Sequence, residues 1–288
     1  MPKASVIFDG SGIKDSSKKT YLSRLKTLNE GKEPSNYKFL QDTAAIEAKL
    51  EKYATNSKRG FYIAIVAFLP EKNAARKHYY ARMMEINKAT RDNTEKSDTQ
   101  KENWMSQEQV QEVWEKLKTE AEPLLKKKQL SEAETNLLQS YVVLSLYVMQ
   151  PPRRSLDYTE MIVVPKYDEN MDKKFNYLSL KDKMFYFNNY KTAGTYKTQA
   201  IPVPEDLFNL LKKYRKTGLL LMKNDKAVTP PQITHILNKI FGKKISVSML
   251  RNIYLSSKYG AESKELSKDT DDMGTSVNSA IHTYIKKD

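Results

Sequence analysis

A polar stretch divides this chain of 288 residues into two unequal parts. Residues 88–103 contain almost no apolar side chains, and their basic residues are balanced by acidic ones. Such a stretch cannot bury enough apolar surface to form a core of its own. The chain is also longer than a typical single domain. We therefore predict two domains, residues 1–87 and 106–288, joined by a polar linker over residues 88–105.

Apolar residues recur at helical spacing through the first predicted domain. One side of the helix predicted for residues 16–28 carries Tyr21, Leu22, Leu25 and Leu28, whereas its basic residues lie mostly elsewhere. Similar patterns predict helices over residues 43–53, 58–69 and 73–86. The first domain is therefore expected to be a compact bundle of about four helices.

The second predicted domain combines helical patterns with three short apolar runs. One helix begins with Ser106 as its cap, another begins near Ser131, and helical patterns resume over residues 205–215, 230–241, 246–254 and 276–285. The apolar runs, at residues 161–164, 184–187 and 199–203, predict a small antiparallel sheet. Gly194 can supply the positive φ needed by its last turn, residues 190–197. The expected fold class is mainly α with a small antiparallel β-sheet (α+β).

Basic residues outnumber acidic residues by 49 to 35, which gives a formal charge of +14. Such an excess attracts polyanions, and nucleic acid is the first partner to consider. In the first predicted helix, Lys18, Lys19 and Arg24 lie mostly outside the apolar stripe. We therefore predict that these three residues contact the nucleic acid.

The chain has no cysteine, and its three histidines lie far apart in the sequence. Neither a disulfide framework nor a metal site is therefore expected. No apolar run reaches the roughly 18 residues of a membrane span, and the first ten residues lack the pattern of a signal peptide. We expect an intracellular protein that binds no metal and no membrane.

Two segments of the second predicted domain present basic residues at defined places. In YVMQPPRRSLDY, residues 147–158, a hydrophobic helix ends at two prolines that precede Arg153 and Arg154. The predicted last turn of the sheet, YKTAGTYK, carries Lys191 and Lys197. In isolation, such residues are most often solvated surface charges.

Two further segments follow near the end of the chain. The segment SVSMLRNIY, residues 246–254, carries Arg251 at the start of a predicted helix. The segment MGTSVNSAIHTY ends at Tyr284. Arg251 lies 251 − 154 = 97 residues after Arg154, and Tyr284 lies 284 − 275 = 9 residues after Thr275.

In this order and at these intervals, the four segments resemble the sequence boxes of tyrosine recombinases, also called integrases. That family has an arginine after a hydrophobic helix, a lysine in a β-turn, a second arginine box, and a Gly-His box that leads to a nucleophilic tyrosine. The resemblance covers nearly the whole chain. It implies a helical core-binding domain followed by a catalytic domain.

The resemblance implies that Arg154, Lys191, Arg251 and Tyr284 are the catalytic residues. Arg154 is preferred to Arg153 because an acidic residue, Asp157, follows it by three positions, as is usual in the family. Arg153 is kept as the alternative to Arg154. Lys197, in the same turn, is the alternative to Lys191.

The chain departs from the family pattern at three places. Two prolines precede the first arginine pair, a variant that resembles relatives in large DNA viruses and their parasites. Ser248 stands where a histidine or lysine is usual, and Thr275 stands where a histidine or tryptophan is usual. The resemblance therefore implies secondary roles for Ser248 and Thr275 without identifying a histidine for proton transfer.

These residue types suit the breaking and rejoining of a phosphodiester. Guanidiniums clamp the non-bridging oxygens, on which charge accumulates, and they favour the ionised form of a nearby phenol. Tyr284 would attack the phosphate, and Lys191 would protonate the departing 5′-oxygen. The covalent intermediate keeps the energy of the phosphodiester, so no cofactor is expected.

The resemblance also implies the partners and the location of the protein. Double-stranded DNA would be the substrate, and the chain would assemble as a homotetramer on two DNA sites, with a monomer left open as the free form. The protein would act in the host cytoplasm or nucleus, wherever its target DNA lies. Two alternatives stay open: relaxation of DNA by a type IB topoisomerase-like enzyme, and a catalytically impaired DNA-binding protein of the same fold.

Overall fold

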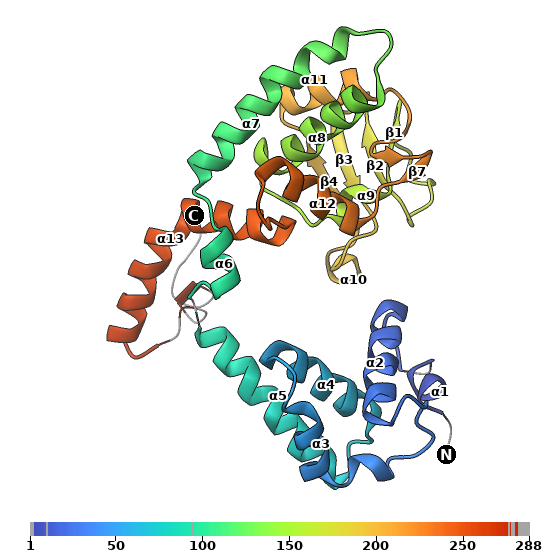
Figure 1. Cartoon of the computed structure of the whole chain (residues 1–288), viewed down its shortest axis with the longest axis vertical. Coiled ribbons are helices and arrows are strands. Elements are labelled where there is room, and N and C mark those ends of the chain that lie inside the picture. Colours follow the sequence, from blue (N-terminus) through green and yellow to red (C-terminus); the bar gives the residue numbers. More distant parts are fainter. Residues whose placement is uncertain (1–2, 10, 94, 276, 278–279, 282–288) are drawn as a thin grey trace. The chain divides into compact units, whose positions relative to one another are not determined.

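The computed structural model describes residues 3–9, 11–93, 95–275, 277 and 280–281. The chain separates into two compact units, Met1–Glu95 and Lys96–Asp288. Each unit has its own core of buried apolar side chains. The described part is mostly helical with a small sheet in the second unit, which is an α+β arrangement (Figure 1).

The first unit is built from helices. Its elements are α1 (Ala4–Asp9), α2 (Asp15–Leu28), the 3-10 helix Lys38–Leu40, α3 (Thr43–Leu50), α4 (Thr55–Phe68) and α5 (Ala74–Asp92). Leu25 and Leu28 of α2 are buried, as the apolar stripe predicts, and they share a core with Ile65 and Phe68 of α4. The side chain of Asn73 caps α5 by accepting from the backbone N–H of Ala75.

Much of the polar segment over residues 88–105, which the sequence predicts to be a linker, is helical. Helix α5 continues to Asp92, and α6 (Asp98–Asn103) begins at a capping box made by Ser97 and Gln100. The buried Asn103 accepts a hydrogen bond from the backbone N–H of Lys244 at 2.9 Å. A polar composition does not prevent a capped helix, and the last residue of this short helix ties it to the rest of the second unit.

Helices dominate the second unit as well. They are α7 (Gln107–Ala121), the 3-10 helix Glu122–Lys126, α8 (Glu132–Val148), α9 (Leu156–Thr159), α10 (Ala193–Tyr196), α11 (Glu205–Tyr214), α12 (Pro230–Phe241) and α13 (Val247–Asp272). Ser106 caps α7 as predicted, and Ser131 caps α8 in the same way. Helix α8 carries many buried side chains and packs against α7, α11 and α12.

The sheet of the second unit is mixed, so the prediction of a purely antiparallel sheet was wrong. It contains β1 (Met161–Val164), β2 (Asn176–Ser179), β3 (Met184–Phe187), β4 (Gln199–Pro202) and β5 (Gly218–Leu219), in the order β4-β3-β2-β1-β5. Strands β1 and β2 are parallel, and the other pairs are antiparallel. The polar ends of β2 hid this strand from the sequence pattern. A separate hairpin pairs β6 (Met222–Lys223) with β7 (Lys226–Ala227).

The connection between β3 and β4 also differs from the predicted turn. Gly194 lies inside the short helix α10, and the positive φ, 57°, belongs to Lys197 at the end of that helix. The hydroxyl of Tyr190 donates to the carbonyl oxygen of Lys197 at 2.7 Å. This bond joins the two ends of the connection, so the reversal of the chain does not depend on glycine.

Candidate functional site

A cavity of about 350 Å³ lies in the second unit. Its walls come from the segment between α8 and α9, the sheet end with the β3–β4 connection, and the start of α13, and one side of it is open. Its lining residues are Gln150, Pro151, Pro152, Arg153, Arg154, Asp157, Phe187, Tyr190, Thr192, Tyr196, Gln199, Ile201 and Arg251. The cavity thus brings together the arginine pair and the later arginine that the sequence singled out.

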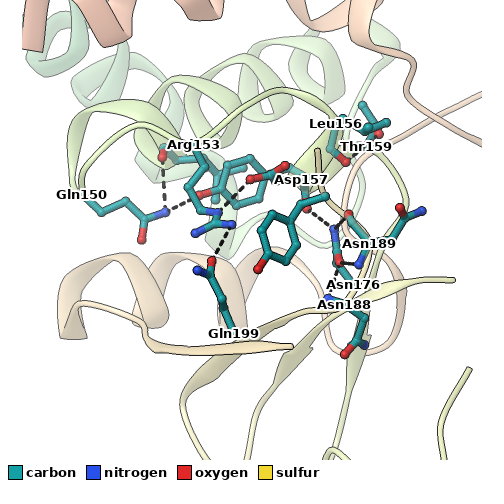
Figure 2. A network of polar contacts seen from close by, with 12 residues as sticks. Gln150, Arg153, Leu156, Asp157, Thr159, Asn176, Asn188, Asn189 and Gln199 are labelled. Atoms are coloured by element: carbon teal, nitrogen blue, oxygen red, sulfur yellow. Dashed lines mark hydrogen bonds and ion pairs between the residues drawn. The ribbon is translucent and has the colours of Figure 1, made fainter. Parts of the chain in front are cut away.

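Arg153 is held on several sides (Figure 2). Its Nε donates to Oδ2 of Asp157 at 2.8 Å, and its Nη2 donates to Oε1 of Gln199 at 3.1 Å. Its guanidinium carbon lies 3.8 Å from the ring centre of Phe187 and 5.4 Å from that of Tyr190. Arg153 therefore joins the segment after α8 to strands β3 and β4, and two of the five N–H donors of its guanidinium are used in these bonds.

Asp157 provides a buried negative charge beside the arginines. Its side chain is only 3% exposed, against 20% for Arg153. Within the described part of the chain, its Oδ1 atom has no hydrogen-bond partner. Burial raises the pKa of Asp157 above its ordinary value, although the positive charges of Arg153 and Arg154 act in the opposite direction. The sequence offered Asp157 as a reason to prefer Arg154, but the carboxylate hydrogen-bonds to Arg153.

Arg154 and Arg251 are the other two guanidiniums of the cavity, and both are partly exposed. Two prolines end the helical run before Arg154, while Arg251 follows the buried Leu250 on α13. Burial, and next the positive charge of Arg154, lower the pKa of Arg251, whereas Asp157 acts to raise it. One carboxylate thus stands beside three guanidiniums, so the cavity favours an anion.

The two candidate lysines lie in the β3–β4 connection. Lys191 is exposed and stands between Tyr190 and Thr192, both of which line the cavity. Lys191 itself is not among the lining residues. Lys197 is exposed as well, and its carbonyl group, not its ammonium group, takes part in the hydrogen bond to Tyr190.

The remaining predicted site residues lie away from the cavity lining or outside the described residues. Ser248 is exposed in the first turn of α13 and does not line the cavity. Thr275 follows α13, where its N–H donates to the carbonyl oxygen of Thr270 at 2.9 Å, and it does not line the cavity either. Tyr284, the predicted nucleophile, lies outside the described residues.

A network of buried asparagines, which the sequence did not reveal, supports the cavity (Figure 2). The side chain of Asn176 makes four hydrogen bonds. Its Nδ2 donates to the carbonyl oxygens of Asp157 and Asn189, each at 2.9 Å, and its Oδ1 accepts from the N–H groups of Asn188 and Asn189, each at 2.8 Å. The network connects the arginine segment to the start of the β3–β4 connection. The sequence carries no local signal for this network, because the burial of Asn176 and its backbone partners are set by the fold.

The three predicted DNA contacts on α2 have different surroundings in the first unit. Lys19 is exposed. Nζ of Lys18 lies 3.3 Å from Oδ1 of Asp9 and 3.2 Å from Oδ1 of Asp15. The hydrogen bond to Asp15 raises the pKa of Lys18. Arg24 donates through Nη1 to the carbonyl oxygen of Gly60 at 3.1 Å, which ties α2 to α4. Lys19 is therefore the most accessible of the three for an external phosphate.

Among the described residues, no group of three or more acidic, histidine or cysteine side chains is arranged to hold a metal ion. None of the helices in that part of the chain has the length and apolar character needed to cross a membrane. Comparison of the chain with protein-family models, with curated proteins and with solved structures gives no match. The residues of the cavity and their order in the sequence therefore carry the evidence for function.

Proposed function

We propose that the chain is a site-specific tyrosine recombinase that cleaves and rejoins duplex DNA through a covalent 3′-phosphotyrosine. The observation that carries this proposal is the meeting of Arg153, Arg154 and Arg251 in one cavity. Arg251 comes 97 residues after Arg154 (251 − 154). Three guanidiniums against a single carboxylate suit a phosphodiester, whose non-bridging oxygens accept hydrogen bonds from arginine.

The three arginines have two different roles in this mechanism. Arg154 and Arg251 contact the non-bridging oxygens and stabilise the charge that accumulates there in the transition state. Arg153 is already bonded to Asp157 and Gln199, so it holds the frame of the cavity. Keeping the arginines in place before DNA arrives reduces the cost of organising them during the reaction.

The chemical step transfers a phosphoryl group from the 5′-oxygen of the DNA to the phenolic oxygen of Tyr284. The phenol of Tyr284 loses its proton to solvent, which the nearby guanidiniums favour, and its phenolate oxygen attacks phosphorus. A bond forms between that oxygen and phosphorus, and the bond from phosphorus to the 5′-oxygen breaks. Lys191 gives its proton to that oxygen, which leaves as a 5′-hydroxyl. Attack by another 5′-hydroxyl reverses these steps and rejoins the DNA. The assignment of Tyr284 is supported by its sequence interval from Arg251 and Thr275.

Covalent capture of DNA from a library of random sequences tests this function. The purified chain is incubated with a random-sequence duplex library, denatured with detergent, and the DNA attached to protein is sequenced. We expect wild-type protein to yield adducts enriched in a common sequence, and Tyr284→Phe to yield none. Tyr259→Phe, which changes an exposed tyrosine of α13, is the matched control and retains adduct formation.

Assays on the recovered DNA site distinguish a recombinase from a topoisomerase-like enzyme and from a DNA-binding protein without activity. On two copies of the recovered site, a recombinase exchanges strands between duplexes, whereas a topoisomerase-like enzyme relaxes supercoiled plasmid without exchange. If wild-type protein retains the enriched DNA only before denaturation, the chain is a DNA-binding protein and the enzymatic proposal fails.

A further inference from the structure

We infer that Asn176 is a positioning residue that sets the place of the Lys191 turn relative to the arginine segment. This inference rests on the proposed function, because it assigns Lys191 the role of proton donor. Asn176 lies at the start of β2 and is 4% exposed. Neither its side chain nor β2 lines the cavity, so its effect on the reaction would act through other residues.

The hydrogen bonds of Asn176 allow only one orientation of its side-chain amide. The carbonyl oxygens of Asp157 and Asn189 can only accept, and both face Nδ2. The N–H groups of Asn188 and Asn189 can only donate, and both face Oδ1. A flipped amide would lose all four bonds. The buried amide group is therefore fully used in joining two chain segments.

These two segments carry the groups that must act on the same phosphate. One is the segment containing Arg153, Arg154 and Asp157, which Asn176 reaches through the Asp157 carbonyl group. The other begins at Asn188 and leads within three residues to Lys191. Asn188 is fixed further by Tyr167 and Thr198, whose hydroxyl groups donate to its Oδ1 at 3.4 and 2.9 Å. Asn176 thus gives both segments a common anchor.

Asn176→Asp removes the hydrogen bond from residue 176 to the Asp157 segment but keeps hydrogen bonds to the segment that begins at Asn188. A carboxylate has nearly the same shape and still accepts from the N–H groups of Asn188 and Asn189. It cannot donate to the carbonyl oxygens of Asp157 and Asn189, and it repels both. The link to the Asp157 segment is therefore lost, whereas the two bonds from the N–H groups of Asn188 and Asn189 are kept. Asn189→Ala is the matched control, because it removes only the exposed bond from Nδ2 to the carbonyl oxygen of Lys174. Its backbone bonds to Asn176 are unaffected.

The test compares two DNA substrates that carry the sequence recovered with wild-type protein. One has the ordinary 5′-oxygen at the cleaved bond, and the other has sulfur there, whose thiolate leaves without a proton. We expect Asn176→Asp to slow single-turnover cleavage of the ordinary DNA by about tenfold to a hundredfold, as when a general acid is misplaced. On the sulfur substrate its rate should return to within about threefold of wild type, and Lys191→Ala should behave in the same way.

Other outcomes overturn the inference. Equal slowing on both substrates would mean that Asn176 supports the arginines or the fold, and wild-type rates on both would mean that it has no positioning role. If Asn176→Asp does not fold, Thr198→Val is the second variant. Thr198 is exposed, and this substitution removes the hydrogen bond that its hydroxyl group donates to Asn188. It should show a smaller loss with the same recovery on sulfur. Absence of adducts with wild-type protein would instead refute the proposed function itself.

Discussion

Nε of Arg153 donates to Oδ2 of Asp157 at 2.8 Å, so the buried carboxylate is paired with the first of two adjacent arginines. Oε1 of Gln199 accepts a second hydrogen bond, from Nη2 of the same guanidinium. Arg154, the next residue, lines the same cavity and is partly exposed. Neighbours in sequence therefore have different tasks: Arg153 maintains the structure, and Arg154 is the candidate for phosphate binding.

This division predicts unequal effects for two alanine substitutions. Arg153→Ala leaves the carboxylate of Asp157 buried without its partner, which should lower the free energy of unfolding by about 3 kcal/mol. Arg154→Ala should lower it by less than about 1 kcal/mol, since this side chain is partly exposed. Urea denaturation of the two variants measures both values. Equal losses would contradict the assignment of the structural role to Arg153.

Asp157 predicts a particular dependence of stability on pH. Because burial raises its pKa in the folded state above the ordinary value of 3.8, the folded state holds the proton more tightly than the unfolded chain. This group's contribution to stability is complete below pH 3.8 and is lost as the pH rises through the folded-state pKa.

Comparison with Asp157→Asn isolates this contribution, because other titrating groups are shared. The difference in unfolding free energy, wild type minus variant, should fall as the pH rises from 3.8 and become level once the folded-state pKa is passed. Urea denaturation at a series of pH values follows it. A difference that grows with pH would show that the pKa of Asp157 is lowered by its arginines.

The excess of guanidinium groups in the cavity predicts binding of inorganic phosphate. Bound phosphate should raise the melting temperature of the wild-type protein relative to sodium chloride of equal ionic strength. Arg251→Ala should weaken this binding by about tenfold to a hundredfold, the usual value of a hydrogen bond to a charged group. Lys216→Ala, which removes an exposed charge elsewhere, should leave the phosphate effect unchanged. An equal effect of both substitutions would indicate non-specific attraction only.

The basic residues of α2 predict separable effects on DNA binding and on stability. Lys19→Ala should weaken DNA binding and reduce the slope of log affinity against log salt by about one unit, with no change in stability. Arg24→Ala should lower the stability of the first unit by about 1 kcal/mol, because the bond to Gly60 is lost. Salt titrations and thermal unfolding measure these effects. Loss of stability in Lys19→Ala would contradict the description of Lys19 as a solvated residue.

Local patterns predicted much of the secondary structure because its determinants lie close together in the sequence. The cap at Ser106, the strand at Met161–Val164 and the helix at Pro230–Phe241 follow from capping chemistry, apolar runs and proline placement. The parallel pairing of β1 with β2 was missed because strand direction depends on the route of the connecting chain. A local pattern carries no information about that route.

In the candidate site, too, local motifs could be predicted from the sequence, whereas contacts between distant segments could not. Arg154 and Arg251 could be selected from motif order, and the cavity contains both. The partners of Arg153 could not be predicted in full, because Gln199 and Phe187 come from other strands. The spacing of four between Arg153 and Asp157 is the local signal for their ion pair, whereas the family pattern favours the spacing of three from Arg154. Asn176 acts entirely through backbone groups distant in sequence, which side-chain motifs do not encode.

The hydrogen bond from Lys244 to Asn103 determines where the second unit should be cut if it is expressed alone. A fragment that starts at residue 106 would lose α6, leave the Lys244 N–H without its acceptor, and remove Trp104, which packs against the core. A fragment that starts just before Ser97 keeps the capping box and the whole helix. Domain dissection should therefore follow the helix cap, and the longer fragment should resist proteases at concentrations that degrade the shorter one.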